Sequence, residues 1–297
     1  ELEVVVRIEP TPGSQLALHL DVALQRIAAE ALGDMRGAVV AIDTRSGGVL
    51  AAFSNPGYDP NKFVNGISFG DYALLRDSRD APLLNRVIQG QYPPASTIKP
   101  MLGLAGLNRG VIDVDTLVAD PGYFTLPGDD RRYRDWILRI RGTGHADFMN
   151  LRDSIAQSCD VYFYELANRL GIDALSDSLY EFGIGSLTGV DLPSEKRGIL
   201  PSAQWQRETV GSSWYGGETL LAGIGQGYML ATPLQLAVAT SAVAMRGAAY
   251  KPHLVASIAG EAVIPEPLLS VSAPTKYWDE IVAGMVDTVF APRGTAA

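Results

Sequence analysis

The chain has 297 residues, of which 47% are hydrophobic, and its formal net charge is -9 at pH 7. That length and apolar content allow one large globular domain or two ordinary ones. The acidic balance argues against a nucleic-acid partner, because binding phosphates requires a basic surface, and no apolar run is long enough to span a membrane.

The first twenty residues predict a short strand and a turn ahead of the main domain. Residues 2–8 alternate in part between apolar and charged side chains, and prolines and a glycine follow at residues 10–13. The start of the chain lacks the basic and apolar regions of a signal peptide. We therefore expect either a cytoplasmic protein or one whose targeting segment has been removed.

A helix and a hairpin are predicted next. Asp21 is a good N-cap for a helix with apolar residues at helical spacing, which ends at Gly33. Residues 37–42 and 49–53 are short and rich in β-forming residues, and a loop with two glycines separates them. Their nearly continuous apolar character predicts a central position for this hairpin.

Further along the chain, two segments rich in polar and turn residues, 55–91 and 113–150, alternate with predicted helices. Asn150 caps a short helix that runs to Gln157. Thr232 and Pro233 are an N-cap and a first helical residue, and they open an almost wholly apolar, buried helix to Met245. The last helix, residues 277–290, carries one apolar stripe and is expected to cover a core from outside.

The segment from Tyr92 to Pro100 contains a serine and a lysine three positions apart. Ser96 follows paired prolines at the start of a predicted buried helix, and Lys99 lies one turn further. Such residues share a helix face, and burial favours the neutral form of a lysine, which is a base. The pattern predicts a nucleophilic Ser96 activated by Lys99. The alternative is an N-capping serine and a lysine that extends its amine to water.

A second polar motif, Ser158-Cys159-Asp160, lies in a loop between two predicted helices, the second of which ends at Gly171. The hydroxyl of Ser158 could relay a proton between a lysine, a nucleophile and a leaving group. Asp160 could hold the lysine and a substrate amide. Helix capping is the alternative explanation for both residues.

These motifs together resemble the transpeptidase domain of class B penicillin-binding proteins. The resemblance rests on residues 94–100, residues 158–160 and the glycine-rich residues 223–227 that run into residues 232–237. The segment around residues 20–25 and the following hairpin match the same family, so the resemblance covers nearly the whole chain. It implies an α/β (α+β) penicillin-recognising serine transpeptidase or β-lactamase-like fold, with an antiparallel sheet and helices on both faces.

The resemblance also implies a mechanism and a set of site residues. A serine deprotonated by a lysine would attack the D-Ala-D-Ala carbonyl of a peptidoglycan stem peptide, expel D-alanine and pass the acyl group to an amine on a neighbouring strand. β-Lactams would trap the same serine. The implied catalytic residues are Ser96, Lys99, Ser158 and Asp160, and the implied substrate-binding residues are Gly225, Gln226 and Gly227.

Softer matches point to the elongation-specific branch of the class. They lie at residues 55–61, 66–68, 120–122 and 133–136. This branch implies the periplasmic face of the bacterial inner membrane, an anchor outside this chain, and a membrane glycosyltransferase and the cell-elongation complex as partners. Residues 1–20 would be the end of a pedestal or linker region, and residues 21–297 the transpeptidase domain.

Two departures from the family pattern carry consequences. Asp160 stands where many relatives have Asn, which would favour the protonated form of Lys99. The third family motif, Lys-Thr/Ser-Gly on a strand, is absent, and the Lys-Arg-Gly at residues 196–198 comes at the wrong point in the order. We expect a domain without its C-terminal strands, a hairpin unpaired on one edge, and no acylation by a polypeptide that ends at Ala297.

Four residues of the second polar segment and its flank predict a metal site. Asp120, Asp135, His145 and Cys159, the one cysteine, offer ligands that zinc accepts in a closed tetrahedron. Scattered residues of these types are more often unrelated surface and core groups. However, a long irregular insert without its own core needs a stabilising cross-link or metal, and metal coordination protects a lone thiol from oxidation. The resemblance adds that some elongation-type relatives carry zinc at matching positions. We expect a structural Zn²⁺ that the chemistry itself does not require.

Other functions stay open at this point. A serine β-lactamase or D,D-carboxypeptidase would share Ser-x-x-Lys, and a non-catalytic β-lactam-sensing domain would be acylated without joining peptides. Slow hydrolysis of the acyl-enzyme and peptide cross-linking distinguish a transpeptidase from these. His19 and His253 are expected to be structural, while Trp214, Tyr215 and Tyr228 belong to either a substrate groove or the core.

Overall fold

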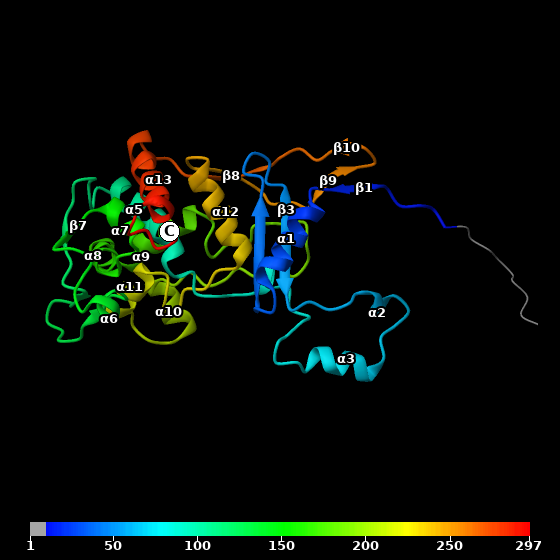
Figure 1. Ribbon diagram of the computed structural model, residues 1–297, viewed down its shortest axis with the longest axis horizontal. Coiled ribbons are helices and arrows are strands. Elements are labelled where there is room, and N and C mark those ends of the chain that lie inside the picture. The colour runs from blue at the N-terminus through cyan, green and yellow to red at the C-terminus, as the bar shows by residue number, and fades with distance from the viewer. Residues whose placement is uncertain (1–9) are drawn as a thin grey trace, which may run out of the picture.

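The computed structural model describes residues 10–297, and helices account for most of its regular secondary structure (Figure 1). The strand predicted over residues 2–8 lies outside the described residues. The helices are α1 (Val22–Leu32), α2 (Asn61–Val64), α3 (Phe69–Arg76), α4 (Arg86–Gln89), η1 (Ala95–Ile98, a 3-10 helix), α5 (Lys99–Asn108), α6 (Leu138–Arg141), α7 (Leu151–Ala156), α8 (Asp160–Leu170), α9 (Ile172–Glu181), α10 (Ala203–Thr209), α11 (Gly216–Gly223), α12 (Pro233–Ala244) and α13 (Thr275–Phe290).

The strands are short, and every ladder between them is antiparallel. They are β1 (Leu16–Leu18), β2 (Gly37–Ile42), β3 (Val49–Asn55), β4 (Val118–Ala119), β5 (Tyr123–Phe124), β6 (Tyr133–Arg134), β7 (Phe148–Met149), β8 (Ala248–Tyr250), β9 (Val255–Ile258), β10 (Glu261–Ala262) and β11 (Pro267–Ser270). The pairs are β2 with β3, β4 with β7, β5 with β6 and β8 with β11, while β9 lies between β1 and β10.

Helix α5 lies inside the helical body and contacts α7, α8, α9 and α13. All of its residues from Lys99 to Leu107 are buried, as its apolar sequence predicts. Two glycines let neighbouring helices approach closely: a Cβ on Gly106 would lie 2.7 Å from a Leu166 methyl, and one on Gly103 would lie 2.9 Å from a Leu151 methyl. Such contacts leave no room for added side-chain volume. The predicted buried helix is therefore confirmed.

The predicted hairpin forms from β2 and β3, and helices α1, α4 and α12 pack against it. Gln25 of α1 completes the outer edge of β3, because its side-chain amide both donates to and accepts from the Ala52 backbone at 3.0 and 2.9 Å. The hairpin is less enclosed than its sequence predicts, since every residue of β2 is only half buried. Within residues 10–297, no third named strand joins β2 and β3.

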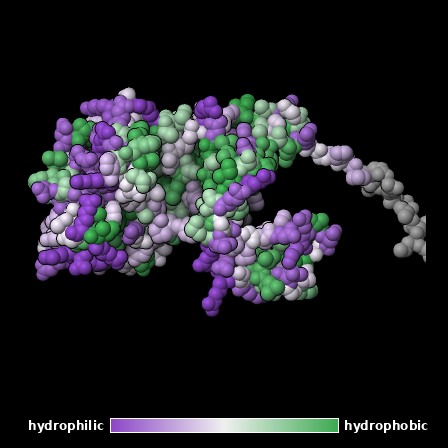
Figure 2. Space-filling model, viewed as in Figure 1, coloured by the Kyte–Doolittle hydropathy of each residue, from purple (hydrophilic) through white to green (hydrophobic). Residues whose placement is uncertain are grey.

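Between β3 and α4 the chain makes an excursion that carries α2 and α3 away from the body (Figure 1). Figure 2 shows that hydrophobic and polar side chains are interspersed on this projection. Its most exposed apolar side chains are Phe69, Leu74 and Val64, which are 97%, 76% and 73% exposed. Within the described residues, no helix combines the length and the hydropathy needed to cross a membrane.

Helix boundaries follow local signals that are visible in the sequence. Asp21 caps α1 by accepting hydrogen bonds from the backbone of Ala23 and Leu24 at 2.8 and 3.1 Å. Asn150 caps α7, and Thr232 forms a reciprocal capping box with Gln235 at the start of α12. The predicted caps at all three positions are confirmed.

Substitution of Asp21 tests whether its side chain stabilises the start of α1. Asp21→Ala is expected to lower the free energy of unfolding by about 1 kcal/mol, because two backbone N–H groups lose their acceptor. Asp21→Asn keeps an acceptor oxygen and is the matched control. Urea denaturation followed by circular dichroism measures both variants, and an unchanged stability of the alanine variant would contradict the capping role.

Candidate active site

The start of η1 places Ser96 at a strained point of the backbone. Ala95, directly before it, has a φ of 50°, a left-handed conformation that costs free energy for a residue with a Cβ. The Ala95 N–H donates to the Gly225 carbonyl at 2.9 Å. Gly225 itself has a φ of 68°, and a Cβ there would lie 2.2 Å from the Ala95 carbonyl oxygen. A glycine is therefore required beneath the serine.

Lys99 is almost fully buried, with 1% of its surface exposed, and its amine makes three hydrogen bonds. It donates to the Ser158 carbonyl at 2.9 Å, the Ser158 hydroxyl at 3.2 Å and the Asp160 carboxylate at 2.6 Å. The Ser158 hydroxyl in turn donates to the Ser96 hydroxyl at 2.8 Å. Hydrogen bonds thus connect the Lys99 amine to the Ser96 hydroxyl through Ser158, whereas the helical spacing alone predicts a direct contact between the amine and the Ser96 hydroxyl.

The loop that carries Ser158 is also strained and is fixed from two sides. Ser158 has a φ of 54°. The Asp135 carboxylate accepts the backbone N–H groups of Asp160 and Val161 at 2.6 and 3.2 Å, and so caps the start of α8. The indole of Trp136 donates to the Ser158 carbonyl at 3.1 Å. Neither contact is apparent from the sequence, because both partners lie more than twenty residues away in the chain.

Burial of Asp160 disfavours its charged form and raises its pKa above the usual value, although the neighbouring Lys99 acts in the opposite direction. The carboxylate is nevertheless the closest partner of the Lys99 amine. A cavity of about 410 Å³ lies beside Ser96 and Lys99. Its lining includes Ser96, Lys99 and Ser158, together with apolar side chains of α13 such as Met285. Ser96 and Ser158 are therefore both partly exposed at this cavity, while Lys99 stays buried.

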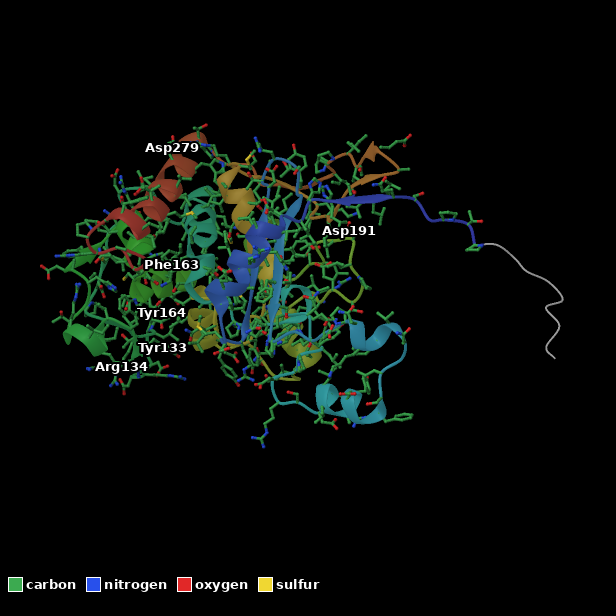
Figure 3. The ribbon with its side chains drawn as sticks, turned by 45° about the vertical axis from the view of Figure 1, so that its right-hand side comes forward. Tyr133, Arg134, Phe163, Tyr164, Asp191 and Asp279 are labelled. Carbon is green, nitrogen blue, oxygen red and sulfur yellow. The ribbon has the colours of Figure 1, made fainter. Side chains whose placement is uncertain are left out.

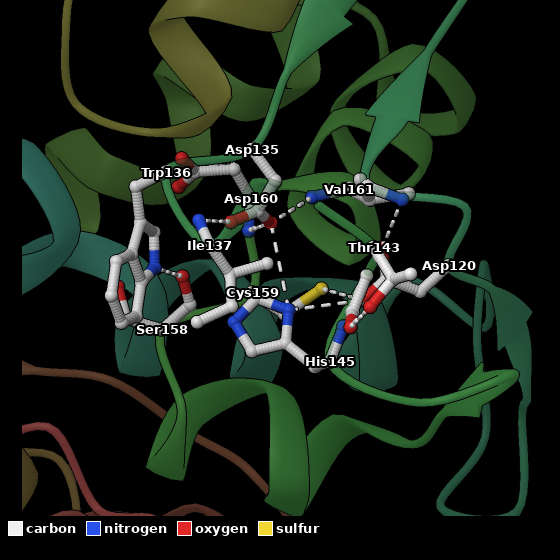
Figure 4. Close-up of polar contacts among 12 residues, drawn as sticks. Asp120, Asp135, Trp136, Ile137, Thr143, His145, Ser158, Cys159, Asp160 and Val161 are labelled. Atoms are coloured by element: carbon white, nitrogen blue, oxygen red, sulfur yellow. Dashed lines mark hydrogen bonds and ion pairs between the residues drawn. The ribbon is translucent and has the colours of Figure 1, made fainter. Parts of the chain in front are cut away.

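Four buried side chains with possible metal ligands come together at the loop that carries Ser158 (Figure 4). We call them the four-residue cluster, and they are Asp120, Asp135, His145 and Cys159. One ligand atom from each lies within 4.8 Å of the others, and all four residues are buried. The Asp120 carboxylate is 2.9 Å from His145 Nδ1 and 3.7 Å from Cys159 Sγ. The sequence therefore groups these four residues correctly.

Electrostatics within the four-residue cluster favour a cation. Burial, followed by the charges of Asp120 and Asp135, raises the pKa of the Cys159 thiol. Burial opposes ionisation of Asp120, but hydrogen bonds from His145 and Gly122 outweigh it and lower the pKa of this carboxyl. The Nε2 atom of His145 has no hydrogen-bond partner within the described residues. A buried set of O, N and S donors, in which His145 Nδ1 faces the carboxylates of Asp120 and Asp135, fits a zinc ion.

The predicted substrate-binding residues, the two other histidines and the three aromatic residues differ in their burial and contacts. Gln226 borders a cavity of about 1050 Å³ that also includes Asp160, and Gly227 is exposed beside it. His19 and His253 contact each other through their Nε2 atoms at 3.1 Å. Of the three aromatic residues, Trp214 packs against the core and donates to the Thr219 hydroxyl, and Tyr215 is 66% exposed. The Tyr228 ring lies 5.3 Å from that of Trp205, tilted by 55°.

Comparisons with known proteins agree on one family. The family model described as "Penicillin binding protein transpeptidase domain" matches residues 37–297. Peptidoglycan D,D-transpeptidase MrdA of Acinetobacter baumannii is 44% identical, over 97% of this chain and 43% of that protein. The MrdA of Escherichia coli K12 is 40% identical, over 97% of this chain and 46% of that protein. The chain thus spans about half the length of the curated relatives it matches.

Solved structures show the same likeness. Pseudomonas aeruginosa PBP2, determined in complex with WCK 5153, gives a TM-score of 0.90 at 46% identity, covering 98% of this chain and 63% of that one. PBP2 of Helicobacter pylori in complex with MreC gives a TM-score of 0.84 at 36% identity, covering 95% of this chain and 50% of that one. The predicted fold class is therefore confirmed.

Gly225 tests how strictly the backbone beneath Ser96 is fixed. Gly225→Ala should displace Ala95 and slow covalent labelling by penicillin about 100-fold, because small misplacements of a nucleophile are costly. Gly110→Ala is the matched control, since Gly110 has a φ of 66° but nothing within 4 Å of its added Cβ. Stopped-flow labelling of the natural full-length protein measures both rates. Equal rates for the two variants would contradict a role for the close contact.

Proposed function

The chain belongs to the family of penicillin-binding protein transpeptidase domains, and on that premise we propose that it is the catalytic domain of a peptidoglycan D,D-transpeptidase active in cell-wall elongation. β-Lactams inhibit it by acylating Ser96. The observation that carries the proposal is the hydrogen-bonded series from Ser96 through Ser158 to Lys99 and Asp160. It joins a nucleophile to a buried amine through a single hydroxyl.

In the first half-reaction Ser96 Oγ forms an ester with the carbonyl carbon of the penultimate D-alanine. The proton of Ser96 passes through the Ser158 hydroxyl to Lys99 in its neutral form. The peptide bond to the terminal D-alanine then breaks, and the proton returns along the same route to the departing amine. Asp160 and the Ser158 carbonyl hold the Lys99 amine in place throughout.

In the second half-reaction an amine of a neighbouring strand attacks the ester carbonyl. Its proton leaves through Ser158, Ser96 Oγ is released and recovers a proton, and a new peptide bond joins the two strands. Each half-reaction uses the same relay in opposite directions, so no further acid or base is required. The half-buried position of Ser96 at the edge of a cavity supports access by both peptides in turn.

We also propose the partners and location that fit this activity. The Helicobacter pylori relative is described in complex with MreC, and a further relative, 34% identical, belongs to a peptidoglycan synthase complex that couples polymerisation to cross-linking. By analogy, the domain works at the periplasmic face of the bacterial inner membrane, beside a membrane glycosyltransferase and the cell-elongation complex. Stem peptides and β-lactams are the small molecules that we propose it binds.

We further propose that the four-residue cluster binds a structural Zn²⁺. The buried donor set supports this assignment, with His145 Nδ1 2.9 Å from the Asp120 carboxylate and 3.8 Å from that of Asp135. Bound zinc would stabilise the thiolate of Cys159 and neutralise the adjacent carboxylates. Because Cys159 lies between Ser158 and Asp160, the cluster would fix the loop that positions the proton relay. No step of the reaction depends on the metal itself.

Labelling by a fluorescent penicillin tests the proposed nucleophile and relay. Ser96→Ala is expected to abolish the covalent adduct in intact-protein mass spectra. Ser158→Ala should still be labelled at Ser96, but between about 100 and 10,000 times more slowly, since it loses only the proton relay. A normal rate for the Ser158 variant would rule out the relay, and labelling of the Ser96 variant would rule out the nucleophile.

Metal analysis tests the zinc proposal independently of activity. Freshly purified protein should contain stoichiometric zinc, and His145→Gln or Cys159→Ser should lose it together with thermal stability, because a structural metal contributes folding free energy. His253→Gln, which also replaces a buried histidine, should keep the metal. Absence of zinc from the wild type, or its retention in the His145 variant, would contradict the assignment.

A further inference from the structure

A short segment of this acidic chain is strongly basic. Residues 131–141 contain five arginines and a single acidic residue, although the chain as a whole carries a net charge of -9. The segment runs from β6 through α6 and lies in the polar insert between the two catalytic motifs. Its arginines are exposed, and they are Arg131, Arg132, Arg134, Arg139 and Arg141.

Three of these arginines, Arg132, Arg134 and Arg139, line a cavity of about 1050 Å³, which we call the arginine cavity. Figure 3 shows Arg134 at the periphery of the helical lobe, beyond Tyr133 and Tyr164. The cavity also borders the catalytic loop, because Asp160 is among its lining residues.

The positive charge of the arginine cavity is not neutralised by the protein. Within residues 10–297, no arginine of the segment forms an ion pair with an acidic side chain. The guanidinium of Arg132 lies over the ring of Tyr123, 4.5 Å from its centroid, which fixes its position. The two acidic residues of the lining are already engaged, since Asp160 pairs with Lys99 and Asp135 caps α8.

The remaining lining residues suit a peptide rather than a free ion. Trp136, Tyr123 and Tyr164 offer apolar and aromatic surface, and Gln226 offers an amide beside the catalytic loop. The volume greatly exceeds that of a single carboxylate. Guanidinium groups bind carboxylates through paired hydrogen bonds that a neutral amide cannot replace.

We propose that the arginine cavity is a recognition subsite for a carboxylate of the peptide substrate, a proposal that rests on the proposed transpeptidase function. Arg132, Arg134 and Arg139 bind a side-chain carboxylate while the D-alanine carbonyl lies at Ser96 or while an attacking amine approaches the ester. The subsite therefore selects acidic stem peptides over neutral ones. It is a binding determinant, and its arginines take no part in the bond changes.

The test compares two peptides that end in D-Ala-D-Ala and differ in one group, a free side-chain carboxylate or its amide. In the natural full-length protein, Arg134→Gln and Arg139→Gln should reduce the preference for the acidic peptide about tenfold or more, since each loses a charge-assisted contact. Arg141, on the same helix as Arg139, does not line the cavity, so Arg141→Gln is the matched control. Two rates are measured separately: acylation by donor peptides, and transfer from a preformed acyl-enzyme to acceptor peptides. Their comparison identifies whether the subsite binds the donor or the acceptor peptide.

Direct binding separates this proposal from the function on which it rests. Fluorescence anisotropy with Ser96→Ala protein reports peptide affinity without chemistry, and the acidic peptide should bind more tightly than its amide at low salt and less selectively at high salt. Loss of this preference in the two arginine variants supports the subsite even if penicillin labelling fails. Equal affinities for the two peptides, or equal losses for both in the variants, would overturn it.

Discussion

The buried amine of Lys99 is the constraint on which the rest of the site depends. A charged or polar amine at 1% exposure is tolerated only when every available donor has a partner. Ser158, in the loop before α8, and Asp160, the first residue of α8, provide those partners, so α5 and the start of α8 must meet at a fixed distance. The Ser96 hydroxyl is then held within reach of the amine by a single intervening group.

Three features of the backbone maintain this geometry. Ala95 and Ser158 both adopt left-handed conformations, which persist only where surrounding contacts enforce them. Gly225 lies directly beneath Ala95, and Asp135 caps the helix that begins at Asp160. Because Asp135 also belongs to the four-residue cluster, the proposed zinc would stabilise the same loop that the proposed proton relay uses. The Asp135 carboxylate of the insert thus links the proposed metal site to the loop that carries Ser158.

Local signals in the sequence predicted the caps at Asp21 and Thr232, the hairpin and the burial of α5, because each depends on neighbours in the chain. The family resemblance correctly indicated the fold, and it implied that the motif of Ser96 and Lys99 lies next to the motif of Ser158 and Asp160. The sequence also indicated that the Ser158 hydroxyl could link the lysine to the serine, but the left-handed backbone at Ala95 and Ser158 was not predictable, since tertiary contacts impose it. The contacts of Trp136 and Asp135 with the loop that carries Ser158 were missed because the partners lie more than twenty residues apart in the chain. The half-exposed hairpin shows that an apolar sequence alone does not establish central burial.

A double-mutant cycle on the rate of penicillin acylation tests the central claim, that Lys99 acts on Ser96 through Ser158. Lys99→Met and Ser158→Ala are measured singly and together in the natural full-length protein. If both belong to one proton path, the double variant should react no more slowly than the Lys99 variant alone. Losses that multiply would show that the two side chains act independently and would contradict the relay.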